Sequence, residues 1–203
     1  SASRKAVLPI FEKENGLLYY PTFYEGLEQS PNVFYTGQEA TQQILAGIDW
    51  AVKEKGAKTF YLLGSDYIWP RTSNKIARKH IDKLGLKVVG EEYYPLGNTQ
   101  FGSLTNKIKL KKPDVIFAAV VGGSNVAFYK QLKAAGITAD KQTLLTLSVT
   151  EDELLGIGGE NMAVGASVIL EEWFRNKEMA LAMALNVAVS RVGSVINNIL
   201  SPT

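Results

Sequence analysis

Hydroxyl and aromatic side chains follow four apolar segments of the chain, at the point where each segment ends. The four groups are YYPTFY at residues 19–24, SDYIWP at 65–70, GGSN at 122–125 and SVTEDE at 148–153. If the apolar segments are parallel strands of one sheet, their carboxyl ends share one edge, where α/β proteins usually bind ligands. Rings as walls and hydroxyls as hydrogen-bonding groups suit a small, neutral, polar ligand.

These residues also have a purely structural interpretation. A buried tyrosine can pack its ring in a core and hydrogen-bond its hydroxyl, and a Ser or Thr after a strand can cap the following helix. For any one residue the structural interpretation is the more frequent one. The repeated position at strand ends nevertheless favours a binding site, and the loop that contains Ser65, Tyr67 and Trp69 is its first candidate.

The elements that would position these groups alternate between helix-like and strand-like patterns. Apolar residues with helical spacing, ended by Gly or Pro, predict helices at 41–56, 71–85, 101–112 and 125–137. Short apolar runs predict strands at 59–64, 87–97, 114–123, 143–149 and 161–170. This alternation predicts an α/β fold, a three-layer, doubly wound and mostly parallel sheet of at least five strands.

The two ends of the chain depart from this pattern. Residues 1–40 contain one helix-like and two strand-like segments, and we expect them to form part of a first lobe and a hinge. Residues 41–170 are then a second α/β lobe. Residues 171–203 predict an apolar helical tail, in which Asn186 and Arg191 interrupt the apolar run and make it marginal as a membrane span.

The composition excludes several kinds of chemistry. A formal charge of +2 over 203 residues does not indicate a nucleic-acid partner. Without cysteine and with His80 as the one histidine, the chain has no disulfide framework, Cys/His zinc site or thiol nucleophile. It also has no nucleophile-plus-base set or phosphate-loop motif, so we predict no enzyme, cofactor or metal. The lysine-rich run at 107–112 is interpreted as the solvated end of a helix, where cations complement the helix dipole.

Four long segments, in this order, resemble the urea and short-chain amide branch of type I periplasmic binding proteins, the solute receptors of ABC transporters. They are SRKAVLPIFEKENGLLYYPTFYEGLEQSPNVFYTGQEATQQ, GSDYIWPRTSN, GEEYYPLG and GGSNVAFYKQLKAAGI, and the resemblance covers about residues 1–168. It implies two lobes joined by a hinge that close on a small neutral amide such as urea. It also implies an ABC permease as partner and the periplasm as location, although no signal peptide is visible in this chain.

The resemblance implies ligand contacts at individual residues. These are Ser1, Tyr20, Thr22 and Tyr67, with an aromatic side chain at Trp69 and with Ser124 and Ser148 on loops that face the same cleft. The family has further βα units ahead of the SRK segment, and residues 171–203 more weakly resemble a segment of major facilitator transporters. We therefore expect a truncated or fused receptor.

Two other functions remain open at this point. The same lobe would serve an amide-sensing regulatory protein, which binds a partner protein rather than a permease. A membrane-associated transporter-fusion fragment would instead use the tail as an anchor. In each case an incomplete first lobe and an apolar tail would leave apolar surface exposed, so we expect self-association.

Overall fold

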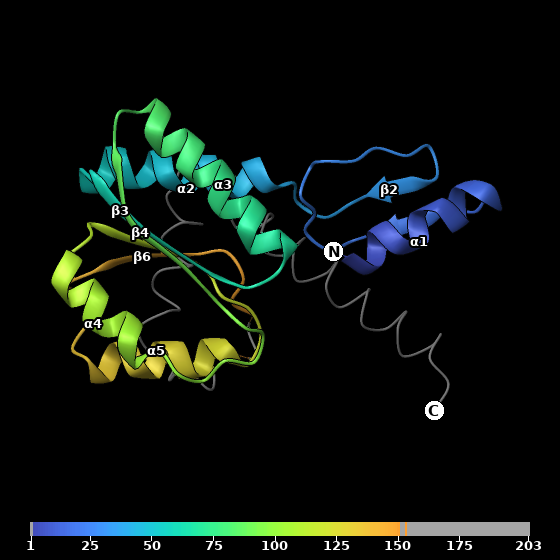
Figure 1. The fold of residues 1–203 in the computed structure, drawn as a ribbon. Coiled ribbons are helices and arrows are strands. Elements are labelled where there is room, and N and C mark those ends of the chain that lie inside the picture. The colour runs from blue at the N-terminus through green and yellow to red at the C-terminus, as the bar shows by residue number, and fades with distance from the viewer. Residues whose placement is uncertain (1, 151–152, 154–203) are drawn as a thin grey trace, which may run out of the picture. The chain divides into compact units, whose positions relative to one another are not determined.

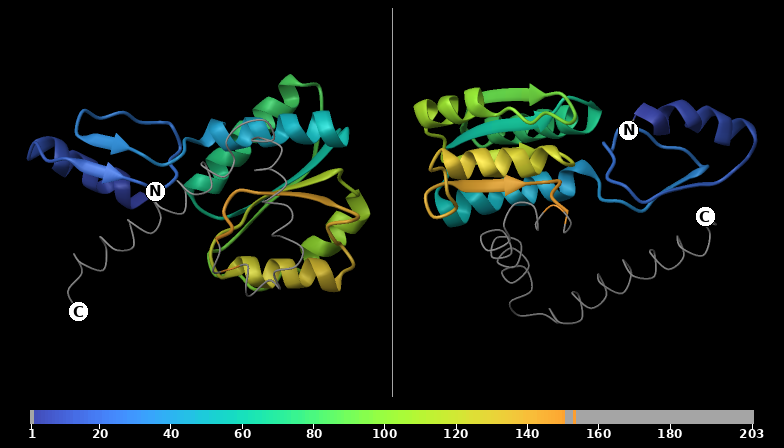
Figure 2. Two further views of the ribbon diagram at one scale, coloured as in Figure 1. Left: turned by 180° about the vertical axis from the view of Figure 1, so that it is seen from behind. Right: turned by 90° about the horizontal axis from the view of Figure 1, so that it is seen from below.

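The computed structural model describes residues 2–150 and 153, and its main feature is a four-stranded parallel sheet (Figure 1). The strands lie in the order β4-β3-β5-β6 and are β3 (Thr59–Ser65), β4 (Lys87–Tyr94), β5 (Val115–Ala119) and β6 (Thr143–Thr146). Helices α2 (Ala40–Lys55) and α3 (Ile68–Lys83) cover one face of this sheet, and α4 (Gly102–Lys111) and α5 (Ser124–Ala134) cover the other (Figures 1 and 2). The predicted three-layer α/β fold is confirmed, while the strand predicted at 161–170 lies outside the described residues.

The connections that follow the neighbouring strands β3 and β5 lead in opposite directions, β3 out to β4 and β5 out to β6. Helix α3 leads from β3 out to β4, whereas α4 brings the chain back past β3 to β5 on the other face of the sheet. Strands β3 and β5 pair in parallel from Phe60↔Val115 to Gly64↔Ala119. Their carboxyl ends are therefore a topological switch point, the position at which doubly wound sheets bind ligands.

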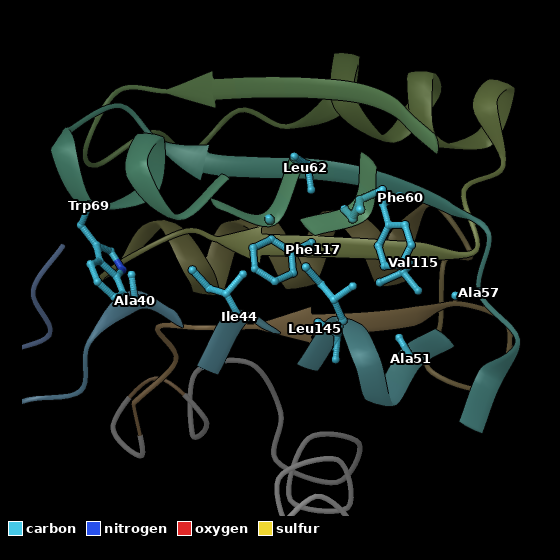
Figure 3. Close-up of a cluster of buried hydrophobic side chains, with 13 residues drawn as sticks. Ala40, Ile44, Ala51, Ala57, Phe60, Leu62, Trp69, Val115, Phe117 and Leu145 are labelled. Carbon is cyan, nitrogen blue, oxygen red and sulfur yellow. The ribbon is translucent and has the colours of Figure 1, made fainter. Parts of the chain in front are cut away.

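One layer of the core lies between the sheet and helices α2 and α3 (Figure 3). Because successive strand residues point to opposite faces, Phe60 and Leu62 of β3 share one side and pack there with Phe117 of β5. Ile44 on α2 and Ile81 on α3 cover the cluster on its helix side and are fully buried. Burying one such side chain contributes about 1.5–3 kcal/mol, so this cluster stabilises the packing of α2 and α3 on the sheet.

Two helix starts differ from the sequence prediction. Helix α2 begins at Ala40, one residue ahead of the predicted start, and is capped by Glu39: the Glu39 carboxylate accepts from the Thr41 backbone N–H at 3.0 Å and Gln42 Oε1 accepts from the Glu39 N–H at 2.7 Å. Helix α3 begins at Ile68, three residues ahead of the predicted start. Pro70 falls in its first turn, where a missing N–H costs nothing because no intrahelical acceptor is available.

Residues 2–39 form a smaller group of elements. Helix α1 (Ala2–Lys13) precedes β1 (Leu18–Tyr20) and β2 (Val33–Tyr35), which pair in parallel as a separate two-stranded sheet. After β2 the chain crosses close to the end of β1: a Cβ atom on Gly37 would lie 2.1 Å from the Thr22 carbonyl oxygen, so only glycine fits there. The lobe boundary at residue 40 stays a prediction, and the boundary at 170 and the tail at 171–203 lie outside the described residues. Within the part that the structure describes, no helix is long and apolar enough to cross a membrane.

Candidate functional site at the carboxyl edge of the sheet

The loops that follow β3 and β5 are joined at the switch point. The Val121 backbone N–H donates to Ser65 Oγ at 3.1 Å, and Ser65 is 2% exposed. On the other side of β3, the Asp66 backbone N–H donates to the Tyr94 carbonyl oxygen at 2.7 Å. Ser65 was predicted to contact ligand, and the structure shows that its oxygen also holds two strand ends together.

Tyr67 occupies the N-cap position of α3 with extended backbone and is half-buried. Burial raises the pKa of its phenol, and the negative charge of Glu25 and the nearby Tyr20 raise that pKa further. The hydroxyl is therefore protonated at neutral pH and available as a hydrogen-bond donor. Because Tyr20 affects Tyr67 electrostatically, these two residues with predicted ligand contacts lie in the same region, although they are 47 residues apart in sequence.

Trp69 lies in the first turn of α3 rather than in a loop. Its side chain is 4% exposed and belongs to the hydrophobic core, at the end of the cluster beside Ala40 (Figure 3). The indole ring stacks on Phe23 with 5.6 Å between ring centroids, and no partner for its Nε1–H lies in the described part of the chain. Trp69 thus connects the core to the 20–24 loop, and its predicted contact with ligand stays a prediction.

Ser124 and Ser148 lie at the ends of β5 and β6, and both carry a buried Oγ with no hydrogen-bond partner among the described residues. Ser124 is the first residue of α5 and is 2% exposed. The turn before it uses Gly122 at φ +64°, a left-handed backbone conformation that favours glycine. Since an unsatisfied buried hydroxyl costs about 1–3 kcal/mol, two of them at one edge suit a hydrogen-bonding ligand.

Asn125 and Glu153 complete this group and were missed as individual residues by the sequence interpretation. Asn125 Nδ2 donates to the Ser148 carbonyl oxygen at 3.2 Å and to Glu153 Oε2 at 3.0 Å, while its Oδ1 has no partner in the described part. Glu153 Oε2 also accepts from the Thr150 N–H at 3.0 Å. Both residues lie within the GGSN and SVTEDE segments, so position at a strand end was the signal that could have found them.

Tyr20 and Thr22 lie in or beside β1, and Ser1 lies outside the described residues. The ring of Tyr20 is covered by the guanidinium of Arg4, whose carbon lies 4.7 Å from the ring centroid. Thr22 is exposed, and its carbonyl oxygen faces Gly37 at the chain crossing. The structure therefore brings Tyr20 toward Tyr67 but places Thr22 at the surface of the described part.

Arg4 is the centre of a buried ionic cluster. Its Nε donates to Glu28 at 2.5 Å, its Nη2 donates to Glu25, and Tyr35 Oη donates to Glu28 at 2.9 Å. Burial raises the pKa of both carboxyls, but the hydrogen bonds from Arg4 outweigh burial and lower the pKa of each below its usual value. All three groups are therefore charged at neutral pH, and the positive charge of Arg4 is directed at two carboxylates.

Arg71, in the first turns of α3, also faces a carboxylate and an aromatic ring. Its Nε lies 2.7 Å from Asp66 Oδ1, and its guanidinium lies over the Tyr93 ring at 4.2 Å from the centroid. Among the described residues, the two arginines near the candidate edge therefore both face carboxylates. A hollow of about 450 Å³ beside Tyr24, Glu28 and Tyr35 contains none of the predicted site residues. The edge offers neutral hydroxyl and amide groups, which can bind and orient a polar solute.

Solved structures of solute receptors share this fold. A solute binding protein of an ABC transporter from R. palustris, in complex with 4-hydroxybenzoate, is 27% identical with a TM-score of 0.68, over 76% of this chain and 43% of that one. A branched chain amino acid ABC transporter protein from Thermus thermophilus with bound valine is 18% identical with a TM-score of 0.68, over 78% and 42%. The second likeness concerns the fold alone. The chain spans less than half the length of either structure.

A second similarity concerns a short stretch only. Over 44 residues the chain is 39% identical to the human lysosomal dipeptide transporter MFSD1, which is 22% of this chain and 10% of the transporter. The match is too short to assign the chain to that group of transporters.

The family comparison covers far more of the chain. A profile of the family described as "Periplasmic binding protein domain" matches residues 1–172 of 203. That family and the solved structures above are solute-binding proteins rather than enzymes, in agreement with the prediction of binding without catalysis. The resemblance seen in the sequence is therefore confirmed at the level of the family, and the chain belongs to the periplasmic binding protein domain family.

Proposed function

We propose that this chain is a ligand-binding part of the solute receptor of an ABC transporter, acts in the periplasm and delivers its solute to an ABC permease. Family membership and the fold shared with solute-binding proteins of ABC transporters support this proposal. The ligand is held at the carboxyl edge of the sheet, between the loops after β3, β5 and β6. Closure of a second lobe over that edge would bury most of a small ligand and retain it.

The proposed ligand is a small uncharged amide such as urea. The observation that carries this choice is a set of buried neutral groups: Ser124 Oγ, Ser148 Oγ and Asn125 Oδ1 have no partners in the described part, while Arg4 and Arg71 already face carboxylates. A carboxylate ligand such as 4-hydroxybenzoate would bring a second negative charge beside the Glu153 carboxylate, which accepts from Asn125 at this edge. An amide instead presents N–H donors to Asn125 Oδ1 and a carbonyl acceptor to a hydroxyl.

The ligand proposal is tested by calorimetric titration of the full chain with urea, acetamide, 4-hydroxybenzoate and valine. We expect heat from urea or acetamide and a much weaker response to the two carboxylates. If 4-hydroxybenzoate binds and the amides do not, the receptor function stands and the amide assignment is wrong. If a folded chain binds none of the four solutes, the solute assignment fails for this chain.

Variants locate the binding. Tyr67→Phe removes one hydroxyl donor, and because a neutral hydrogen bond contributes about 0.5–1.5 kcal/mol, we expect about two- to twelvefold weaker binding. Ser124→Ala should weaken binding to a similar extent. The matched control is Tyr19→Phe, since Tyr19 is 64% exposed on β1 and its ring stacking on Phe34 is preserved by phenylalanine. Equal effects of the Tyr67 and Tyr19 variants would place the ligand elsewhere.

A further inference from the structure

A second concave site lies at the opposite, amino-terminal edge of the sheet. It is a hollow of about 600 Å³, within the range of about 300–1,000 Å³ that is usual for small-molecule sites. The ends of α2 and α4 and the connections that lead into β5 and β6 line it. None of the residues predicted to bind solute is among its lining residues, so it is separate from the site proposed above.

Lysines dominate the rim of this hollow. Lys55, Lys109, Lys112 and Lys141 line it together with two acidic residues, Asp114 and Asp140, so the lining carries four positive and two negative charges. Within the part of the chain that the structure describes, Lys109, Lys112 and Lys141 form no salt bridge. The Asp114 carboxylate is directed away to the start of β3, where it accepts from the Lys58 N–H at 2.9 Å and the Thr59 N–H at 2.8 Å.

Compensation of helix dipoles explains only part of this arrangement. Lys55 and Lys109 lie in the last turns of α2 and α4, where a cation is favourable in any helix. Lys112 is the C-cap of α4, with φ +47°, a left-handed conformation rare outside glycine, and Lys141 lies in the connection between α5 and β6. Three of the four lysines thus lie at helix ends, and Lys141 is brought to the hollow by a connection.

The floor of the hollow is apolar, and hydrogen bonds hold together the connections that line it. Ile108, which is 2% exposed, lines it together with Pro113 and Ile137. Gln142 Nε2 donates to the Pro113 and Asp114 carbonyl oxygens at 3.0 and 3.1 Å, and so ties the connection before β6 to the one before β5. The backbone that carries Lys112 and Lys141 is therefore held in place before any ligand arrives.

We propose that this hollow binds a small organic phosphate, with the lysines around the phosphate group and the apolar floor under the organic part. A phosphate monoester carries a charge of about −1.5 to −2 at neutral pH, which matches the excess of two positive charges in the lining. The proposal goes beyond solute binding at the carboxyl edge. The receptor would then bind a second ligand, an anion, in addition to the neutral solute.

The test is titration of the full chain with adenosine monophosphate, with adenosine and inorganic phosphate as comparisons. Binding of adenosine monophosphate that is absent with adenosine supports the phosphate contact. Weaker binding of inorganic phosphate than of adenosine monophosphate supports the apolar floor. Binding should also fall at high salt, because partly exposed charges are screened. No binding of adenosine monophosphate at low salt, or binding equal to that of adenosine, overturns the proposal.

Lysine variants locate the site. A surface charge pair contributes up to about 1 kcal/mol, so Lys112→Ala and Lys141→Ala should each weaken binding about two- to fivefold, and their combination about tenfold or more. The control is Lys75→Ala, an exposed lysine on α3 that does not line the hollow. Equal loss in the control and in the paired variant would mean non-specific attraction and would refute the site.

The phosphate could be free or part of a lipid headgroup, and vesicles separate these sources. Vesicles of phosphatidylcholine with and without phosphatidylglycerol are tested for co-sedimentation with the chain and with the paired lysine variant. Lysine-dependent binding to anionic vesicles with no response to adenosine monophosphate would assign the lysines to a lipid headgroup and overturn the proposal of a small organic phosphate. Binding to adenosine monophosphate alone identifies a soluble phosphate. Lysine-independent binding to either probe contradicts the proposal.

Discussion

Gly90 on β4 allows an aromatic side chain of the neighbouring strand to cross it. In the pairing of β3 and β4, Tyr61 is opposite Gly90, next to an irregularity in the register. A Cβ atom on Gly90 would lie 2.3 Å from Cε2 of the Tyr61 ring. That ring is 2% exposed and its hydroxyl donates to Glu92, so it has no room to move aside. One residue without a side chain therefore permits the contact between a tyrosine and a carboxylate on the edge strand.

We expect Gly90→Ala to lower the free energy of unfolding by about 1–3 kcal/mol, as overpacking of a filled site does. Guanidinium-induced unfolding followed by circular dichroism measures the effect. Gly102→Ala is the matched control, because a Cβ atom there meets nothing within 4 Å. Adding Tyr61→Ala should remove much of the penalty of Gly90→Ala. Additive effects of the two substitutions would contradict this account.

Individual residues of the candidate site differ in how far the sequence predicts them. Tyr67 and Ser124 were predicted from their position after apolar segments, and both lie at the carboxyl edge of the sheet. Asn125 and Glu153 were not singled out, because their hydrogen bond joins positions 28 residues apart and has no local pattern. Trp69 was expected in a loop ahead of a helix at 71–85, yet α3 already begins at Ile68, and Pro70 is well tolerated in its first turn. Contacts between distant segments were thus the part that sequence patterns could not supply.

The elements themselves follow local rules and were largely predictable. Helix α2 ends at Lys55 before Gly56 at φ +66°, as the glycine predicts, and the apolar run at 59–64 is strand β3 with one further residue. The start of α2 was missed by one residue because a glutamate caps it. The order in which the strands pair could not be predicted in this way, since the return of the chain through α4 past β3 depends on packing across both faces of the sheet.

Asp114 links two neighbouring strands at their starts. Its carboxylate accepts from the Lys58 N–H, the Thr59 N–H and Thr59 Oγ1 at 2.8–2.9 Å. The bond from the Lys58 backbone, followed by those from Thr59, lowers the pKa of Asp114 below its usual value of 3.8. A depressed folded-state pKa stabilises the fold above the unfolded-state value, and this contribution is lost as pH falls through the folded-state pKa.

We therefore expect Asp114→Asn to lower the free energy of unfolding at neutral pH by about 1 kcal/mol, at the low end for bonds to a charged group because the site is exposed to water. The difference from the parent chain should begin to shrink as pH falls below 3.8 and should be lost once pH lies below the lower folded-state pKa, where the parent carboxyl is protonated. Guanidinium titrations at the two pH values measure it, with the exposed Asp82→Asn as control. A difference that is constant across this pH range would show that the charge is not responsible.

At the scale of the whole molecule, the exposed apolar side chains of residues 2–39 matter most. Ile10, Leu17, Tyr19, Leu27 and Phe34 are each about half exposed or more, and the Tyr19 and Phe34 rings stack on each other at 5.0 Å on the two-stranded sheet. A parallel sheet of two strands is rarely stable without further cover. Such a surface favours association with other protein surface, including a second copy of the chain.

We expect the chain to self-associate, with an average mass that rises with concentration in sedimentation experiments. Replacing both Tyr19 and Phe34 by Ser should shift the chain toward the monomer. Leu110→Ser is the control, since Leu110 is 80% exposed but lies on α4. A monomeric mass at every concentration would disprove the expectation, and an equal shift by the control would place the interface elsewhere.

The chain crossing at Gly37 also limits which substitutions the protein can tolerate at that position. Gly37 is only partly buried, and positions of that kind ordinarily accept most amino acids in a library of random substitutions. Here any side chain would meet the Thr22 backbone, which cannot rotate away as a side chain could. In a deep mutational scan, position 37 should therefore reject substitutions as strictly as the buried core does, while its neighbours Thr36 and Gln38 accept them.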